Sequence, residues 1–244
     1  MKSNHKEQSS LKPMGFGLSL VFTGLFMAAL WIALNYLLPM VSKTTNAPPP
    51  LAWYSSTTIA VFLPMLLIAV LMPKLEKQHF SFSRLKNRLR IRKMTGEDWI
   101  WIFISIMLAA ILTMVLFFVG KNNISHFSTQ PALMQIYPLA PEENWILLAW
   151  FPLFLFNLLS EELFWRGYLY ARQQEKFGKK TWLFNGLLWL IFRIPLGLTF
   201  LLVALPSTFL TTYAFQKTHN LKVSIAVNGA MSGLGFMAIA LGYI

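Results

Sequence analysis

Residues 145–171 read WILLAWFPLFLFNLLSEELFWRGYLYA, and this stretch decides the fold class. Its apolar run exceeds the roughly 20 residues that an α-helix needs to cross about 30 Å of hydrocarbon. Charged side chains interrupt it only near its end, at Glu161, Glu162 and Arg166. Similar apolar runs recur along the 244-residue chain. The sequence therefore predicts an all-α fold, a polytopic transmembrane helical bundle.

The composition also indicates a protein of the bilayer. Hydrophobic residues make up 56% of the chain and charged residues 12%, whereas soluble domains carry roughly 25% charged residues. The net charge of +12 is concentrated in short segments between the apolar runs, which is how membrane topology is encoded. We therefore expect membrane lipids, and no nucleic acid, as partners.

We predict about seven spans, and the pattern is compatible with six to eight. Their approximate limits are 15–38, 51–72, 99–120, 145–171, 181–196, 198–215 and 223–243. The fifth and sixth are the least regular, because only Pro195-Leu196-Gly197 separates them and Pro206 interrupts the sixth. They form two spans, a broken hairpin or a re-entrant pair. A break inside a membrane survives only where protein or water satisfies the freed backbone groups.

Basic residues predict the orientation and the division of the chain. The stretch 74–93 holds eight lysines and arginines, and 172–180 holds four. The positive-inside rule places these loops and the N-terminus in the cytoplasm. The chain then divides into a cytoplasmic tail (1–14), three N-terminal spans (15–144) that include a basic cytoplasmic loop (73–98), and a helical core (145–244).

The sequence has no recognisable metal or cofactor motif. It contains no cysteine, which excludes disulfides and thiolate ligands. Its four histidines, His5, His79, His126 and His219, lie in polar segments, and none forms a His-Glu-x-x-His pattern. We therefore expect neither a metal nor a cofactor.

The fourth span carries the densest cluster of ionisable side chains. Glu162 and Arg166 are four residues apart, so they share a helix face and can pair. Glu161 points about 100° away and has no partner at helical spacing. Ionisable groups inside a membrane cost at least about 2.5 kcal/mol each near the bilayer centre. The cluster is therefore either an ion-pair anchor at the interface or a functional site.

Two other spans bring polar residues to a similar depth. At 1.5 Å per residue, Glu161 lies about 16 Å from the basic side of the membrane, Arg193 about 18 Å and Ser232 about 14 Å. Asn228 shares a helix face with Ser232. This convergence favours a site in the cytoplasmic half of the membrane, although small polar residues also mediate ordinary helix packing.

The charged cluster resembles the first motif of the CPBP family of intramembrane proteases. This family includes the type II CAAX prenyl endopeptidases and the bacterial Abi proteins. Its first motif, Glu-Glu-x-x-x-Arg followed by Gly, matches Glu161, Glu162, Arg166 and Gly167. The resemblance covers about residues 145–244 and implies an integral protein of a bacterial cytoplasmic membrane.

The family's second and third motifs match only in part. The second, Phe-x-x-x-His, aligns with Trp189 to Arg193, so that arginine replaces the histidine. The third, His-x-x-x-Asn, aligns with Asn228 to Ser232, so that both of its polar residues are replaced. The first motif is therefore intact, and both family histidines are absent.

The resemblance implies a peptidase-type site in which Glu161 activates a water, while the residues at positions 193, 228 and 232 support it and stabilise the oxyanion. Arg193 cannot accept a proton as histidine does. Opposite Glu161 it would stabilise the charged carboxylate and weaken it as a base. The implied ligand is a prenylated or membrane-bound peptide, in a cavity that opens toward lipid and cytoplasm.

Three hypotheses remain open at this point. The first is a CPBP-type peptidase that retains hydrolysis. The second is an inactive pseudoprotease that acts in immunity, as a scaffold or in complex assembly with a membrane-protein partner. The third is a small transporter, which the charged residues within spans suggest and the lack of an internal repeat disfavours.

Overall fold

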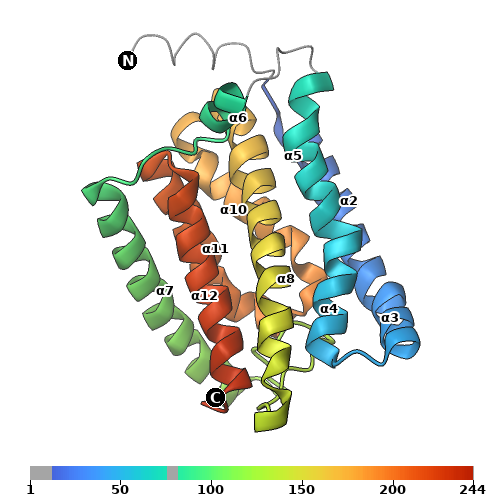
Figure 1. The fold of residues 1–244 in the computed structure, drawn as a ribbon. Helices are drawn as coiled ribbons and strands as arrows, with labels where there is room; N and C mark the ends of the chain where they lie inside the picture. Colours follow the sequence, from blue (N-terminus) through green and yellow to red (C-terminus); the bar gives the residue numbers. More distant parts are fainter. Residues whose placement is uncertain (1–12, 76–81, 244) are drawn as a thin grey trace.

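The computed structural model describes residues 13–75 and 82–243, and the chain within these limits is helical, with no strand. Most of the predicted N-terminal tail (1–14) and part of the basic loop (73–98) lie outside the described residues. The predicted all-α class is confirmed. The helices pack side by side as a bundle (Figure 1).

The first three spans are formed by the N-terminal half of the chain. The first two contain short π-helical segments and a proline at the start of α3 and of α4. The elements are α2 (Phe16–Ile32), η1 (Ala33–Leu37), α3 (Leu38–Thr45), α4 (Pro49–Thr57), η2 (Thr58–Phe62), α5 (Leu63–Leu75), α6 (Phe82–Arg88) and α7 (Gly96–Asn123).

The second half of the chain forms the remaining spans. A long helical run contains the charged cluster and widens into a π-helix directly after Glu162. The elements are η3 (Pro141–Glu143), α8 (Trp145–Glu162), η4 (Leu163–Tyr170), α9 (Ala171–Phe177), η5 (Gly178–Lys180), α10 (Thr181–Phe192), η6 (Ile194–Leu196), α11 (Leu198–Thr218) and α12 (Leu221–Ala240).

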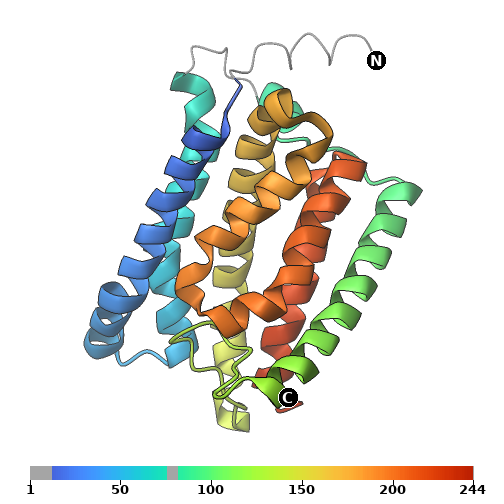
Figure 2. The same ribbon diagram turned by 180° about the vertical axis from the view of Figure 1, so that it is seen from behind.

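The number of passes agrees with the prediction of about seven. Within the described part of the chain, six helical runs are long and apolar enough to cross a membrane. The fifth predicted span is the 12-residue α10, which at 1.5 Å per residue is only about 18 Å long. It runs obliquely from one end of the bundle toward the other before α11 returns (Figure 2). Consistent with an odd number of passes, α2 begins at the end opposite to Tyr243 (Figures 1 and 2).

The sequence explains why α10 stops inside the bundle. Pro195 has no backbone N–H and disfavours helical geometry in the residue before it. Gly197 has φ 101°, a conformation that glycine adopts without the steric cost of a side chain. The turn is closed by backbone hydrogen bonds from Leu196 N to Arg193 O, 2.9 Å, and from Gly197 N to Ile194 O, 3.1 Å. Arg193 is therefore held at the deep end of α10.

The two ends of the bundle differ in chemistry. We call the end that holds α6 and the α11–α12 turn the basic end, because Arg90, Arg92 and Lys222 lie beside these elements. Backbone hydrogen bonds close it, from Met14 N to Arg172 O, 3.1 Å, and from Leu221 N to Arg90 O, 3.0 Å. Its assignment to the cytoplasm remains a prediction of the positive-inside rule.

The opposite end is covered by residues 124–140, and we call it the loop end. Within this segment the Gln130 side chain bonds both the N–H and the carbonyl of Ile136. The segment is also tied to the helices, because Ala132 N donates to Leu196 O, 2.8 Å, and Ala132 O accepts from Trp53 Nε1, 3.2 Å. A cap of ordered backbone therefore closes the bundle at this end.

Helix α7 stands at one side of the bundle and packs on α11 and α12 (Figures 1 and 2). A capping box begins it, in which the Thr95 hydroxyl accepts from Asp98 N and the Asp98 carboxylate accepts from Thr95 N. Asp98 also accepts from Arg92 and Asn220. The basic end of α7 is thus fixed to the α11–α12 turn.

Candidate functional site

Glu161 lies at the centre of a buried hydrogen-bond network. Its Oε1 accepts from Trp189 Nε1, 2.8 Å, and from Arg193 Nη2, 3.0 Å. Its Oε2 accepts from Arg193 Nη2, 3.1 Å, and from Asn228 Nδ2, 3.3 Å. The side chains of Arg193 and Glu161 are only 10% and 9% exposed. Helices α8, α10 and α12 therefore meet at one carboxylate.

Trp189 joins the two arginines of the site. The guanidinium carbons of Arg166 and Arg193 each lie 3.8 Å from the centroid of the Trp189 ring, within the range of cation–π attraction. The same ring donates its N–H to Glu161. In the sequence Trp189 stands as the first residue of the aligned second motif, and it is not among the predicted site residues.

Glu162 and Arg166 form the pair that their spacing predicts. Arg166 Nε lies 3.5 Å from Glu162 Oε2, and both side chains are fully buried. Arg166 Nη2 also donates to the Thr212 hydroxyl, 3.0 Å. Asn228 Nδ2 donates to Glu162 Oε1, 2.8 Å. This pair thereby links α8 to η4, α11 and α12.

The six residues singled out in the sequence form one connected network. Ser232 completes it by donating its hydroxyl to Asn228 Oδ1, 3.2 Å. With both carboxylates and both guanidiniums ionised, the network carries two charges of each sign and has no net charge. The six residues proposed from the sequence thus lie together in the structure, while their selection as site residues and the chemical roles assigned to them remain predictions.

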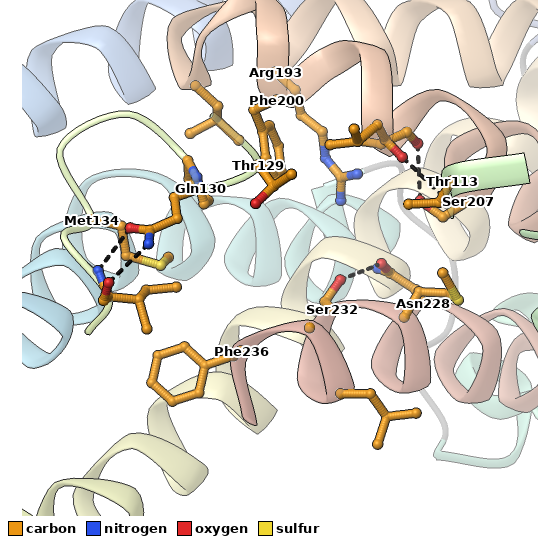
Figure 3. A pocket seen from close by; sticks show the side chains of 18 of the residues that line it. Thr113, Thr129, Gln130, Met134, Arg193, Phe200, Ser207, Asn228, Ser232 and Phe236 are labelled. Carbon is orange, nitrogen blue, oxygen red and sulfur yellow. Dashed lines mark hydrogen bonds between the residues drawn. The ribbon is translucent and has the colours of Figure 1, made fainter. Parts of the chain in front are cut away.

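A cavity of about 890 Å³ adjoins the network. Most of its lining is apolar, and the polar groups of Glu161, Arg193, Asn228 and Ser232 lie at one end. Figure 3 shows the Arg193 side chain pointing across the cavity toward Asn228 and Ser232. This volume falls in the range of small-molecule binding pockets, about 300–1,000 Å³.

The cavity extends from the network toward the loop end. Its lining includes Trp53 and Phe236 on the helices and Gln130 and Met134 in the capping segment. The sequence predicts an opening toward both the lipid and the cytoplasm, the side of the basic loops. In the described structure the segment Phe164–Arg172 on that side of Glu161 is buried, because side chains from the neighbouring helices fill the space around it.

The basic-side barrier includes a close approach at Gly167. A Cβ on this residue would lie 2.6 Å from Leu89 Cδ2, so Leu89 packs directly on the backbone of η4. Leu89 is itself buried and packs with Tyr170 and Phe215. The segment that follows α6 therefore closes the basic end above the glutamates.

The described residues contain no group of three or more His, Cys, Asp or Glu side chains arranged to hold a metal ion. Of the four histidines, His219 lies at the basic end and its Nδ1 is 3.0 Å from Arg90 Nη1. It does not contact the Glu161 network. The cluster that the structure presents is thus one of carboxylates, guanidiniums and amides.

Comparison with known proteins supports the resemblance drawn from the motifs. Residues 143–234 match the family model described as Type II CAAX prenyl endopeptidase Rce1-like. The matched segment contains all six site residues and the elements from η3 into α12. No curated protein and no solved structure matches the chain.

Proposed function

Since this chain carries the Rce1-like segment of the CPBP family, we propose that it is a CAAX-protease-like membrane protein whose site binds a membrane-embedded ligand without hydrolysing it. A protein of this kind acts by holding its ligand and not by converting it, for example in immunity, as a scaffold or in the assembly of a complex. The proposal concerns the chemical state of Glu161, which the family mechanism requires as a base.

The observation that carries the proposal is the saturation of the Glu161 carboxylate. A carboxylate has about four lone-pair sites for hydrogen bonds. Trp189, Arg193 and Asn228 make four contacts with its two oxygens, between 2.8 and 3.3 Å. A general base must instead lie within hydrogen-bond reach of the water whose proton it takes. Three donors therefore already occupy most of the acceptor capacity of Glu161.

The partners of Glu161 also lack the proton chemistry of the residues that they replace. Arg193 stands where the family has a histidine, and a guanidinium stays protonated in proteins. Asn228 stands at the second histidine position and uses its amide N–H groups on Glu161 and Glu162. Its Oδ1 accepts from Ser232. These contacts support a locked network in place of an activated water.

A turnover assay tests the proposal. Purified protein in liposomes is given an internally quenched peptide with a farnesylated CAAX terminus, and the release of fluorescence is recorded. The wild type and the Glu161→Gln variant are expected to give the same signal as empty liposomes. Glu142→Gln is the matched control, because Glu142 is an exposed carboxylate outside the network.

One result would overturn the proposal. Wild-type turnover that is retained in Glu142→Gln and lost in Glu161→Gln would assign Glu161 as a working base. Both variants need the wild-type elution volume and helicity, so that a loss of signal is not a loss of fold. In that case hydrolysis of a prenylated peptide, as the family resemblance implies, would be the function.

A further inference from the structure

The cavity beside the glutamates reaches the surface between two helices. Met114 and Phe118 on α7 and Leu234 on α12 line the cavity, and they are 62%, 57% and 65% exposed. All three lie in the C-terminal halves of their helices, α7 (Gly96–Asn123) and α12 (Leu221–Ala240), which both begin at the basic end. In a membrane this rim faces acyl chains, so the route into the cavity leads from the lipid.

Arg193 supplies the unused hydrogen-bond donors of this cavity. Its Nη2 binds Glu161, while its Nε and Nη1 have no hydrogen-bond partner among the residues that the structure describes. The hydroxyls nearby are already committed as donors, Ser232 to Asn228 and Ser207 to the carbonyl of Ala204. The polar end therefore offers guanidinium N–H groups to a group that accepts hydrogen bonds.

The charge balance of the network selects an uncharged acceptor. Two carboxylates and two guanidiniums already cancel. A carboxylate or phosphate head would add an uncompensated negative charge to a buried site, and an unpaired buried charge is strongly disfavoured. An ester or amide carbonyl accepts the same hydrogen bonds without that cost.

The apolar walls select a lipid over a peptide. An extended peptide brings several backbone N–H and C=O groups, each of which needs a partner in an apolar surrounding. Away from the network, the Thr113 hydroxyl and the Trp53 N–H are bonded to backbone carbonyls and the Gln130 amide to Ile136. Lys121 and Thr129 are further polar residues of the lining there, too few for the backbone of an extended peptide. An acyl chain makes no such demand and suits a lining of residues such as Phe200, Val203 and Phe236.

We infer that the cavity takes an uncharged acyl lipid, which enters between α7 and α12 from the bilayer half near the loop end and places its ester or amide carbonyl against Arg193. This inference rests on the proposed function, because it identifies the ligand that the site binds. The lipid carbonyl then lies at the Glu161 network, and the acyl chain extends past Met114 and Leu234 into the bilayer.

Photo-crosslinking in liposomes tests the inference. The probe is a monoacylglycerol that carries a diazirine at the chain end and an alkyne for detection, and labelled peptides are mapped by mass spectrometry. Labels are expected within 106–121 and 234–239. Moving the diazirine next to the ester should shift the labels to the peptides of Arg193 and Asn228. The reverse pattern would place the head at Lys121 and overturn the orientation.

Paired variants test the route and the carbonyl contact. Met114→Trp should reduce labelling severalfold, whereas Met107→Trp should not, since Met107 is an exposed residue of the same helix that does not line the cavity. Leu234→Trp narrows the rim from the other side and should act like Met114→Trp. The double variant Glu161→Gln/Arg193→Gln removes the guanidinium without leaving a lone charge, and should lower apparent affinity on the order of tenfold.

Three outcomes would overturn the inference. One is equal labelling of the Met114→Trp and Met107→Trp variants. Another is stronger labelling by the matching fatty-acid probe at a pH where it is ionised. The third is displacement of the probe by a farnesylated peptide at a lower concentration than by unlabelled monoacylglycerol. If the peptide is turned over and lipid labelling depends on the rim, the proposed function is refuted and the lipid inference stands. If the peptide is not turned over and lipid labelling does not depend on the rim, the lipid inference is refuted and the proposed function stands.

Discussion

Replacing Arg193 by glutamine should destabilise the protein far more than replacing Arg193 and Glu161 together. The single change leaves Glu161, 9% exposed, with only Trp189 and Asn228 as donors. Removing one partner of a buried ion pair typically costs about 3–5 kcal/mol, because the other charge stays buried and uncompensated. Glu161→Gln leaves the Arg193 charge without its carboxylate and should cost a similar amount.

The double variant Glu161→Gln/Arg193→Gln contains no lone charge. Its two amides can still bond each other, and the lost hydrogen bonds are worth about 0.5–1.5 kcal/mol each. We therefore expect a total loss near 2 kcal/mol, more than about 3 kcal/mol below the sum of the two single variants. Such a coupling is the energetic signature of the contact between these two side chains.

The free energy of unfolding is measured in mixed micelles, by raising the mole fraction of a denaturing detergent and following far-UV circular dichroism. Glu142→Gln serves as the control and should change stability by less than about 0.5 kcal/mol, as exposed substitutions usually do. If the two single losses simply add up in the double variant, Arg193 and Glu161 do not interact, and the argument from carboxylate saturation fails.

Two further predictions concern packing and pH. Gly186→Ala should cost about 1–3 kcal/mol of unfolding free energy, because the new Cβ would lie 2.8 and 3.0 Å from two Phe209 ring atoms. Gly235→Ala, with no atom within 4 Å of the new Cβ, should be neutral or stabilising in the same detergent titration. The pKa of His219 is lowered to about 4, chiefly by partial burial and then by the charges of Arg90 and Arg92. Because its unfolded-state pKa is near 6.5, the unfolded chain binds the proton first. The free energy of unfolding should therefore fall as the pH drops from about 6.5, because protonation of His219 is disfavoured in the folded state, and it should level off below about 4. The pH dependence should vanish in His219→Gln, and an NMR titration midpoint of His219 near 6.5 would contradict the assignment.

The sequence predicted the parts of the site that depend on regular helix geometry. The i,i+4 spacing gave the Glu162–Arg166 pair, and counting residues from the basic loops brought Glu161, Arg193 and Ser232 to a similar depth. Both arguments need only the rise and period of an α-helix. The Glu162–Arg166 pair forms even though Arg166 lies in the π-helical segment η4.

Other parts of the site depend on tertiary geometry that the sequence does not encode locally. The role of Trp189 follows from the rotation of α10 about its own axis, which packing against η4 and α11 determines. The direction of the cavity follows from the closure of the basic end by Leu89 and from the cap at the loop end. The segment 124–140 has no period from which its backbone hydrogen bonds to Leu196 in η6 and Ala240 in α12 could be read.

The balance of charges around Glu161 has an electrical consequence. Moving one elementary charge across a membrane potential of 100 mV changes its free energy by about 2.3 kcal/mol. Two carboxylates and two guanidiniums at one depth respond with opposite forces, and an uncharged lipid that moves along the cavity carries no current. Occupancy of this site should therefore be insensitive to the voltage across the membrane, so that a cell can polarise or depolarise without changing what the protein holds.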